Sequence, residues 1–185
     1  MNRLIFASKN EYKFKEIQEL LNCHKIKLDL YPIDLSETQS DFLEVIASAK
    51  ATCAYNTIKE KLIVEDTGLF IHSLNNFPGP YSSFILKTIG NSGILDLLTT
   101  KSNRSATFKS VVAFNDGLCI RVFSGEVEGT ISTYVAKEGW GYDPIFIPSK
   151  SEKTYGEMRH EKIENSQRTL ALTKFLGWYK DYTSF

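Results

Sequence analysis

Residues 3–31, RLIFASKNEYKFKEIQELLNCHKIKLDLY, contain the pattern that decides the fold class. The apolar run over 3–7 predicts a short buried strand. Phe14, Ile17 and Leu21 then recur at helical spacing, which predicts a helix over 11–22. A second apolar stretch over 26–31 predicts another strand, which stops at Pro32. A strand, a helix and a strand in this order indicate an α/β fold.

The rest of the chain continues this mixture of helices and strands. An apolar stripe over 42–53 predicts a helix with Asp41 as its N-cap, and the run 62–64 predicts a strand that ends in a loop at 65–68. A helix is expected over 81–89, after the break at 75–80. Two strands, 106–114 and 118–127, flank a hairpin turn at 115–117. Helical spacing at the end of the chain predicts a last helix that starts near Ser166. We expect residues 1–185 to form one mixed α/β domain, with two lobes and a cleft between them.

Composition excludes several classes of protein. The 185 residues carry 22 Lys plus Arg and 22 Asp plus Glu, so the formal net charge is zero, which argues against bulk binding to nucleic acid or to anionic membranes. No stretch approaches the about 20 consecutive apolar residues that a membrane-spanning helix needs, so a transmembrane segment is not expected. Lys9 interrupts the N-terminal apolar run too early for a signal peptide, so we expect a cytoplasmic protein. The three cysteines and three histidines have no metal-binding or redox spacing.

Acidic side chains suggest a cation site. Glu65 and Asp66 follow an apolar run that is expected to be a strand, and the carboxyl ends of strands face the ligand crevice of α/β sheets. Glu37 lies in a polar loop before the second helix. Two or three carboxylates that meet there would suit Mg²⁺ bound together with a phosphate. Taken locally, Glu65 and Asp66 are better explained as a pair of solvated loop acids, and each acid alone is unremarkable.

Two other segments suggest a nucleotide. Residues 8–13, SKNEYK, join the first strand to the first helix, where free N–H groups and the charge of Lys13 could hold an anion, although the P-loop and dinucleotide fingerprints are absent. Residues 138–144, EGWGYDP, expose an aromatic ring between glycines, which suits stacking on a base. Lys162 and Arg168 donate hydrogen bonds only, so they would favour a purine with a 6-oxo group over adenine. Each feature also has a purely structural explanation. Residues 8–13 could be a solvated polar turn, residues 138–144 a packed turn, and Lys162 and Arg168 part of a basic surface.

Taken together and in this order, the motifs resemble the inosine/xanthosine triphosphate pyrophosphatase (Ham1-like) family. The matching segments cover nearly the whole chain: ASKNEYK at 7–13, VEDTGL at 64–69, FPGPYS at 77–82, GWGYDPIF at 139–146, TYGEM at 154–158, and 162–168. The resemblance implies a two-lobed α/β fold around a long mixed β-sheet with the site in the cleft. It also implies a homodimer that uses Mg²⁺ to hydrolyse ITP, dITP and XTP to monophosphate and pyrophosphate.

The resemblance also assigns roles by position. Ser8, Asn10, Lys13 and Lys50 would hold the triphosphate, with Lys9 in the same loop. Glu37 and Asp66 would bind Mg²⁺, Asp66 would be the base for the attacking water, and Thr67 would contact the substrate. The base pocket would consist of Trp140, Gly141, Tyr142, Asp143, Lys162, Gln167 and Arg168.

Three residues depart from the family pattern. Lys9 stands where Gly is common, Trp140 where Phe is usual, and Gln167 where His is usual. A larger aromatic ring still stacks on a base. Lys9 adds a charge to the phosphate loop, and Gln167 removes a titratable ring, so these two changes bear on substrate range and pH dependence.

Other functions stay open from the sequence alone. One is a Maf-like pyrophosphatase that acts on pyrimidine or modified nucleotides. Another is a nucleotide-binding regulator without catalysis, although the acids and Lys13 count against it. A nucleic-acid-binding module is less favoured, because the cations are few and interleaved with acids.

Overall fold

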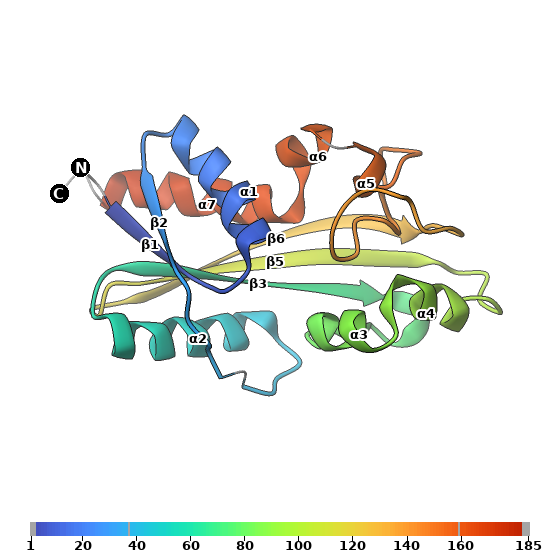
Figure 1. Ribbon diagram of the computed structural model, residues 1–185, viewed down its shortest axis with the longest axis horizontal. Coiled ribbons are helices and arrows are strands. Elements are labelled where there is room, and N and C mark those ends of the chain that lie inside the picture. The colour runs from blue at the N-terminus through green and yellow to red at the C-terminus, as the bar shows by residue number, and fades with distance from the viewer. Residues whose placement is uncertain (1–2, 37, 159, 183–185) are drawn as a thin grey trace. The chain divides into compact units, whose positions relative to one another are not determined.

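The computed structural model describes residues 3–36, 38–158 and 160–182 (Figure 1). The described chain contains a mixture of strands and helices, as predicted. In chain order they are β1 Arg3–Ala7, α1 Glu11–Cys23, β2 Lys27–Tyr31, α2 Leu43–Ile58, β3 Leu62–Ile71, the 3₁₀ helix η1 His72–Leu74, β4 Phe77–Gly79, α3 Ser82–Thr88, α4 Gly90–Leu97, β5 Ser105–Asn115, β6 Ile120–Ile131, β7 Phe146–Pro148, α5 Tyr155–Met158, α6 His160–Asn165 and α7 Gln167–Tyr182.

The described strands form one mixed sheet, which confirms the predicted fold class. Its order is β2-β1-β3-β5-β6-β7, and β4 pairs with β3 off this path. β1 is parallel to both β2 and β3, whereas β4 is antiparallel to β3 and β7 to β6. The parallel pairs come from the strand–helix–strand opening, because a crossover helix is the usual link between parallel neighbours.

The chain divides into two compact units, in agreement with the predicted two lobes. Unit 1 comprises residues 1–66, 110–125 and 168–185, and unit 2 comprises residues 67–109 and 126–167. The three longest strands, β3, β5 and β6, contribute residues to both units. Each unit has its own hydrophobic core.

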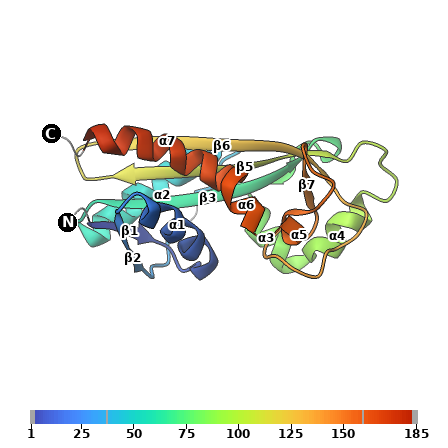
Figure 2. The ribbon, with the colours of Figure 1, turned by 90° about the horizontal axis from the view of Figure 1, so that it is seen from above.

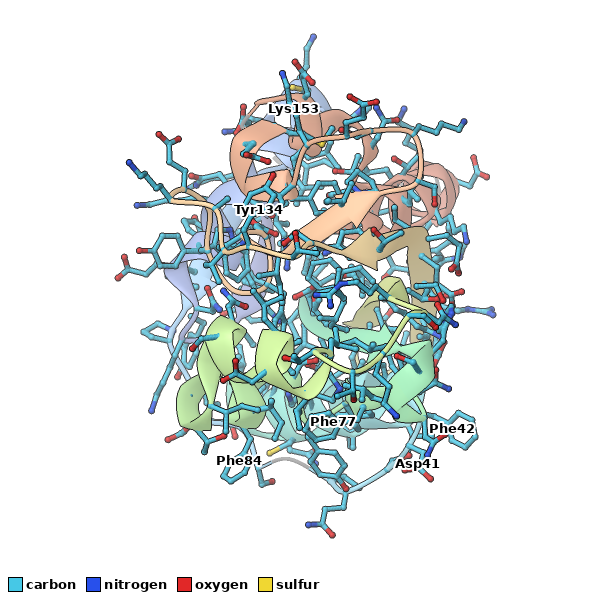
Figure 3. The ribbon with its side chains drawn as sticks, turned by 90° about the vertical axis from the view of Figure 1, so that its right-hand side faces the viewer. Asp41, Phe42, Phe77, Phe84, Tyr134 and Lys153 are labelled. Atoms are coloured by element: carbon cyan, nitrogen blue, oxygen red, sulfur yellow. The ribbon has the colours of Figure 1, made fainter. Side chains whose placement is uncertain are left out.

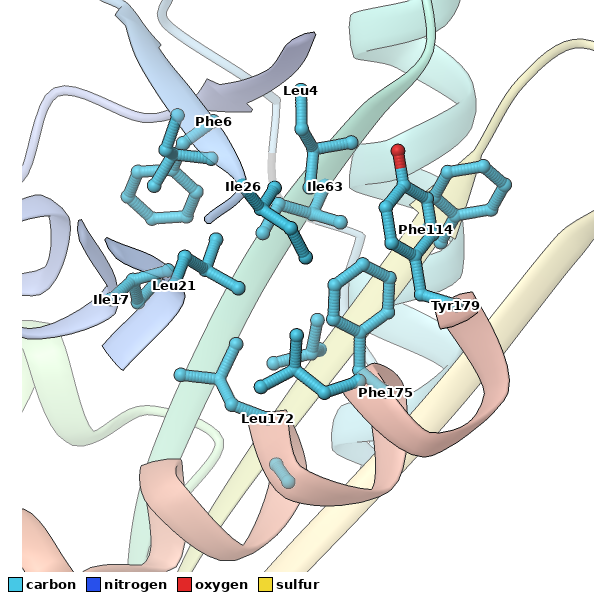
Figure 4. Packing of buried hydrophobic residues seen from close by; sticks show 14 residues of the cluster. Leu4, Phe6, Ile17, Leu21, Ile26, Ile63, Phe114, Leu172, Phe175 and Tyr179 are labelled. Carbon is cyan, nitrogen blue, oxygen red and sulfur yellow. The ribbon is translucent and has the colours of Figure 1, made fainter. Parts of the chain in front are cut away.

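In unit 1 the core lies between the sheet and two helices. Ile17 and Leu21 of α1 are fully buried, and the predicted stripe of α7, which includes Phe175 and Tyr179, packs against β5 (Figure 4). Rings gather there: Phe114 and Trp178 lie 5.1 Å apart between centroids. Phe123 of β6 lies 5.7 Å from Phe175, and Figure 2 shows α7 running alongside β6. The periodicity read from the sequence therefore gives the buried face of both helices.

In unit 2 the core is built around aromatic rings of the strands and of α5. Phe108 of β5 and Phe146 of β7 are buried with ring centroids 5.2 Å apart, and Tyr155 lies 5.2 Å from Phe146. Phe77 of β4 packs against this cluster, whereas Phe84 of α3 is 64% exposed (Figure 3).

The hairpin prediction is confirmed at the β5–β6 turn. Asp116 Oδ1 accepts hydrogen bonds from the backbone N–H groups of Leu118 and Cys119, both at 2.9 Å. Gly117 has a φ of +87°, and a Cβ there would lie 2.1 Å from the Tyr55 hydroxyl. Both the left-handed conformation and the close approach require glycine at this position.

Three local predictions are wrong. Residues 65–68 are not a loop but the middle of β3, because the buried Glu65 has ionic partners and Gly68 lets β4 approach; a Cβ there would lie 2.7 Å from the Gly79 carbonyl oxygen. Asp41 is not an N-cap, since α2 starts at Leu43, after Phe42. The buried face of α2 also differs, because Leu43 is buried while Phe42 and Val45 are 67% and 49% exposed.

Short elements went unpredicted. Helices α4, α5 and α6 and strands β4 and β7 span only three to eight residues each, too few to repeat a periodic pattern. Across the described residues, no helix has the length and apolar character needed to cross a membrane.

Candidate active site

Unit 1 brings together most of the side chains that were predicted to hold phosphate. Asn10 caps α1: its Oδ1 accepts a hydrogen bond from the Lys13 backbone N–H at 3.1 Å, and its own N–H donates to Ser8 Oγ at 3.0 Å. These contacts fix the turn between β1 and α1. The first N–H groups of a helix have no intrahelical partners, and here the Asn10 side chain accepts from one of them, that of Lys13. Phosphate binding at this turn stays a prediction.

Lys13 reaches from α1 to β3. Its Nζ lies 2.7 Å from Glu65 Oε2 and donates to the Glu65 backbone carbonyl oxygen at 3.3 Å. The Lys13 side chain is 15% exposed, so it is largely buried while its ammonium is held by Glu65.

The Glu65 side chain is fully buried, and three groups contact its carboxylate. Oε1 accepts hydrogen bonds from Ser110 Oγ at 2.5 Å and Arg168 Nε at 3.2 Å, while Oε2 pairs with Lys13. Burial raises the pKa of Glu65. The charges of Arg168 and Lys13, with hydrogen bonds from Lys13 and Ser110, outweigh that effect and hold the pKa well below its usual range. Glu65 is therefore ionised at neutral pH.

Arg168 lies between two acids. Besides its bond to Glu65, its Nη1 donates to Glu16 of α1. The Arg168 side chain is 2% exposed. The structure thus groups Arg168 with Lys13 in unit 1. The contact between Arg168 and the base stays a prediction.

Two partners in this cluster, Glu16 and Ser110, were missed from the sequence. Glu16 lies three residues after Lys13, on the same side of α1. Ser110 is a polar residue within the otherwise apolar run of β5 and is fully buried. A glutamate near a lysine on a helix and a serine within an apolar strand are both common in proteins, so neither pattern marks a site residue in the sequence.

Asp66 pairs with Lys50 of α2. Lys50 Nζ lies 3.0 Å from Asp66 Oδ2, and the two side chains are only 12% and 14% exposed. In the parallel pair of β1 and β3, Ile5 is opposite Leu62 and Phe6 is opposite Ile63. Continuing this register places Asp66 just past the carboxyl end of β1, at the level of the turn at 8–10. The predicted base and a predicted phosphate-binding cation are therefore neighbours. Thr67, the next residue of β3, is half-buried.

The predicted metal ligands are only partly described. Glu37 lies outside the described residues, and within the described ranges no group of three or more His, Cys, Asp or Glu residues could hold a metal ion. Asp66 fits Mg²⁺ chemically, because its carboxylate is a hard oxygen donor and Mg²⁺ commonly takes one or two carboxylates plus phosphate oxygens and water. Glu65 does not fit, because cations and Ser110 already contact both of its carboxylate oxygens.

Unit 2 holds the predicted base-pocket segment, residues 138–144. Gly139 and Gly141 have φ values of +100° and +63°, so the glycines are needed for the backbone path. The Tyr142 ring is buried in the core of unit 2, and its hydroxyl donates to the Ser82 backbone carbonyl oxygen at 2.8 Å. Tyr142 therefore anchors the segment through packing, while Trp140 is half-buried.

Lys162 and Asp143 form a buried ion pair in unit 2. Lys162 Nζ lies 2.6 Å from Asp143 Oδ2, and the side chains are 6% and 5% exposed. The same ammonium lies 5.2 Å from the centroid of the Trp140 ring and 5.8 Å from that of Tyr155. Burial and then the Asp143 charge raise the pKa of Tyr155, so this ring stays neutral. The arrangement is a cationic side chain held against an aromatic face.

Two residues that depart from the family pattern lie in different settings. Lys9 pairs with Asp34 at 2.8 Å, and both side chains are largely exposed. Gln167 is 1% exposed, and among the described residues its Oε1 has no hydrogen-bond partner. The chain thus keeps a buried hydrogen-bond acceptor where the family usually has an imidazole.

Comparisons with known sequences cover nearly the whole chain. A sequence model of the Ham1 family matches residues 4–178. A protein of Korarchaeum cryptofilum named dITP/XTP pyrophosphatase is 45% identical over 171 residues, which are 92% of this chain and 92% of that protein. A protein of Methanopyrus kandleri with the same name is 43% identical over 182 residues, or 97% of each chain.

Solved structures agree with these sequence matches. The Ham1 protein of Staphylococcus aureus superimposes with a TM-score of 0.84 at 26% identity, covering 98% of this chain and 100% of that one. A HAM1 protein from Coxiella burnetii gives the same TM-score at 29% identity and the same coverage.

Proposed function

The chain belongs to the Ham1 family, and from this premise we propose that it hydrolyses ITP, dITP and XTP to the nucleoside monophosphate and pyrophosphate, with Mg²⁺ as cofactor. The observation that carries the proposal is the identity of 45% and 43%, over nearly the full length, to proteins named dITP/XTP pyrophosphatase. The cations and acids gathered in unit 1 supply chemistry that suits this reaction.

Binding of the triphosphate is assigned to the start of α1 and to two lysines. The Ser8 hydroxyl and the side-chain amide N–H groups of Asn10 would donate hydrogen bonds to phosphate oxygens. Lys13 and Lys50 add positive charge on side chains that are 15% and 12% exposed. Donors that are already fixed by other contacts stabilise charge that develops on the leaving pyrophosphate, since they need no rearrangement during the reaction.

Asp66 is assigned as the base. Water attacks the α-phosphorus, its proton passes to an Asp66 carboxylate oxygen, and the bond to the oxygen that bridges the α- and β-phosphates breaks. Glu37 and Asp66 would hold Mg²⁺, which supplies Lewis-acid polarisation of the phosphate oxygens. The Lys50 ammonium, 3.0 Å from Asp66 Oδ2, orients the carboxylate.

Recognition of the base is assigned to the segment around Trp140. The Trp140 ring would stack on the purine, with Gly141, Tyr142 and Asp143 shaping the segment and Thr67 as a further substrate contact. Lys162, Gln167 and Arg168 would complete the pocket. The side chains of Lys162 and Arg168 only donate hydrogen bonds, so each would favour a 6-oxo group over the 6-amino group of adenine.

The deciding experiment is a panel of ITP, dITP, XTP, dUTP, dTTP and ATP, assayed for pyrophosphate release with and without Mg²⁺. We expect turnover of the oxo purines with Mg²⁺ and far slower turnover of ATP, because a site built around one hydrogen bond strongly rejects analogues that lack it. Equal rates on ATP and ITP would contradict this account of the pocket. Preference for the pyrimidine nucleotides would instead favour a Maf-like activity.

The assembly and compartment are also proposed. The family resemblance suggests a homodimer, which sedimentation velocity would detect as a species of twice the 21.0 kDa chain mass. A single sedimenting species of one chain mass would contradict it. We place the enzyme in the cytoplasm, where nucleotide pools lie, and its three free cysteines fit a reducing compartment.

A further inference from the structure

Glu65 is an acid that the proposed reaction leaves without a role. It precedes the proposed base Asp66 on β3, and its side chain is fully buried. Lys13, Arg168 and Ser110 contact its two oxygens at 2.7, 3.2 and 2.5 Å. These contacts engage both oxygens, so Glu65 suits neither metal binding nor proton transfer from water.

The ionic partners of Glu65 belong to different parts of the proposed substrate site. Lys13, on α1, is assigned to the triphosphate, and Arg168, on α7, is assigned to the base. The two residues are 155 positions apart in the sequence, yet one carboxylate of β3 contacts both. Arg168 has a second acid, Glu16, whereas Lys13 is also held by the Glu65 backbone carbonyl oxygen.

We propose that Glu65 is a positioning residue that holds the Lys13 ammonium and the Arg168 guanidinium in their working places through one shared negative charge. The inference rests on the proposed function, because it takes the roles of Lys13 and Arg168 from it. It adds that phosphate binding and base selectivity depend on the same buried carboxylate.

A change of charge separates this role from simple packing. Glu65→Gln keeps the side-chain size and an oxygen that can accept from Ser110, but it leaves two cations without their common counter-charge. Removing one partner of a buried ionic group displaces the others or leaves them uncompensated. Lys13 is near the surface and can turn to solvent, and Arg168 can shift toward Glu16.

The test measures two properties of the purified full chain. The first is binding of inorganic pyrophosphate in the presence of Mg²⁺, by titration calorimetry. The second is the ratio of kcat/KM for ITP to that for ATP. For Glu65→Gln we expect each to fall by about tenfold or more, the effect of losing a charged hydrogen bond. Pyrophosphate binding and selectivity that both match wild type would overturn the proposal.

Two control variants isolate the shared charge. Glu126→Gln makes the same substitution on β6, where the carboxylate pairs with Lys109 at 2.9 Å and is 50% exposed, and it should leave both properties unchanged. A loss of the same size in Glu126→Gln would overturn the specific role of Glu65. Lys13→Met tests whether Glu65 affects pyrophosphate binding through Lys13. In the double variant Lys13→Met/Glu65→Gln, we expect the same pyrophosphate affinity as in Lys13→Met alone. A further loss as large as that of Glu65→Gln alone would contradict action through Lys13.

The outcomes also separate this inference from the proposed function. A wild-type protein that turns over none of the panel refutes the function, whereas weaker pyrophosphate binding by Glu65→Gln still supports the positioning of Lys13. If Glu65→Gln fails to fold by circular dichroism, Glu65→Asp replaces it. Its carboxylate is one methylene shorter and cannot reach both cations, so we expect a smaller loss in the same two properties, and unchanged values would overturn the proposal.

Discussion

Asp66 and its neighbour Lys50 make the sharpest prediction about a single residue. Asp66→Asn keeps the shape and a hydrogen-bond acceptor for Lys50 but removes the proposed base, so kcat on ITP should fall by about 10²–10⁴-fold. Steady-state pyrophosphate release measures this. Asp29→Asn, at an exposed pair with Arg3, is the matched control and should retain wild-type turnover. Near-wild-type kcat in Asp66→Asn would remove Asp66 from the mechanism.

The buried pair Lys162–Asp143 predicts a loss of stability. Lys162→Met leaves the Asp143 carboxylate, 5% exposed, without its partner at 2.6 Å. Breaking a buried pair on one side costs about 3–5 kcal/mol. Urea unfolding should show a lower midpoint with an unchanged slope. Lys27→Met, whose side chain is 64% exposed, should leave the midpoint where it was, and an equal shift in both variants would contradict the prediction.

Residue types suggested most of the candidate site residues, but the contacts between these residues could not be predicted from the sequence. Lysine, aspartate and glycine-rich motifs stand out in a sequence because few structural needs explain them together. Ser110 and Glu16 do not stand out, since a serine in a strand and a glutamate on a helix are ordinary. Their importance comes from Arg168 and Glu65, which only the folded chain brings within reach.

At the scale of an element, two variants of Asn10 at the start of α1 distinguish helix capping from anion binding. Asn10→Ala removes the cap to the Lys13 N–H and should destabilise the protein by about 1 kcal/mol. Asn10→Asp keeps a capping oxygen and favours the helix dipole. It also puts a negative charge at the proposed phosphate site, so we expect near-normal stability and weak pyrophosphate binding. Equal pyrophosphate affinity in Asn10→Asp and wild type would argue against a phosphate site there.

The helices α1 and α7 were predictable because their buried faces repeat. Leu172, Phe175, Leu176 and Tyr179 give the face of α7 directly. The continuation of β3 through residues 65–68 was not predictable, because the acids and a glycine read as a loop. Tertiary partners override that local preference: cations neutralise Glu65, and β4 packs closely on Gly68. The same absence of a local signal explains why β4 and β7, three residues each, were missed.

At the scale of the whole molecule, Glu65 links stability to pH. Its pKa is lower in the folded chain than its ordinary value of 4.5, so its contribution is complete above about that value and is lost as the pH falls through the folded pKa. Denaturation midpoints for wild type and Glu65→Gln should differ by a constant amount at neutral pH. That difference should shrink below about pH 4.5. A difference that is independent of pH down to the acid transition would contradict the ionised state of Glu65.

The distribution of aromatic residues gives each unit its own optical signal. The chain has two tryptophans: Trp178, within the ring cluster of unit 1, and Trp140, beside the Lys162 ammonium of unit 2. Variants that replace one tryptophan at a time with phenylalanine would therefore report on the two units separately by fluorescence. Ligand titrations could then assign quenching at Trp140 to the arrival of a base, while Trp178 follows the integrity of the other core.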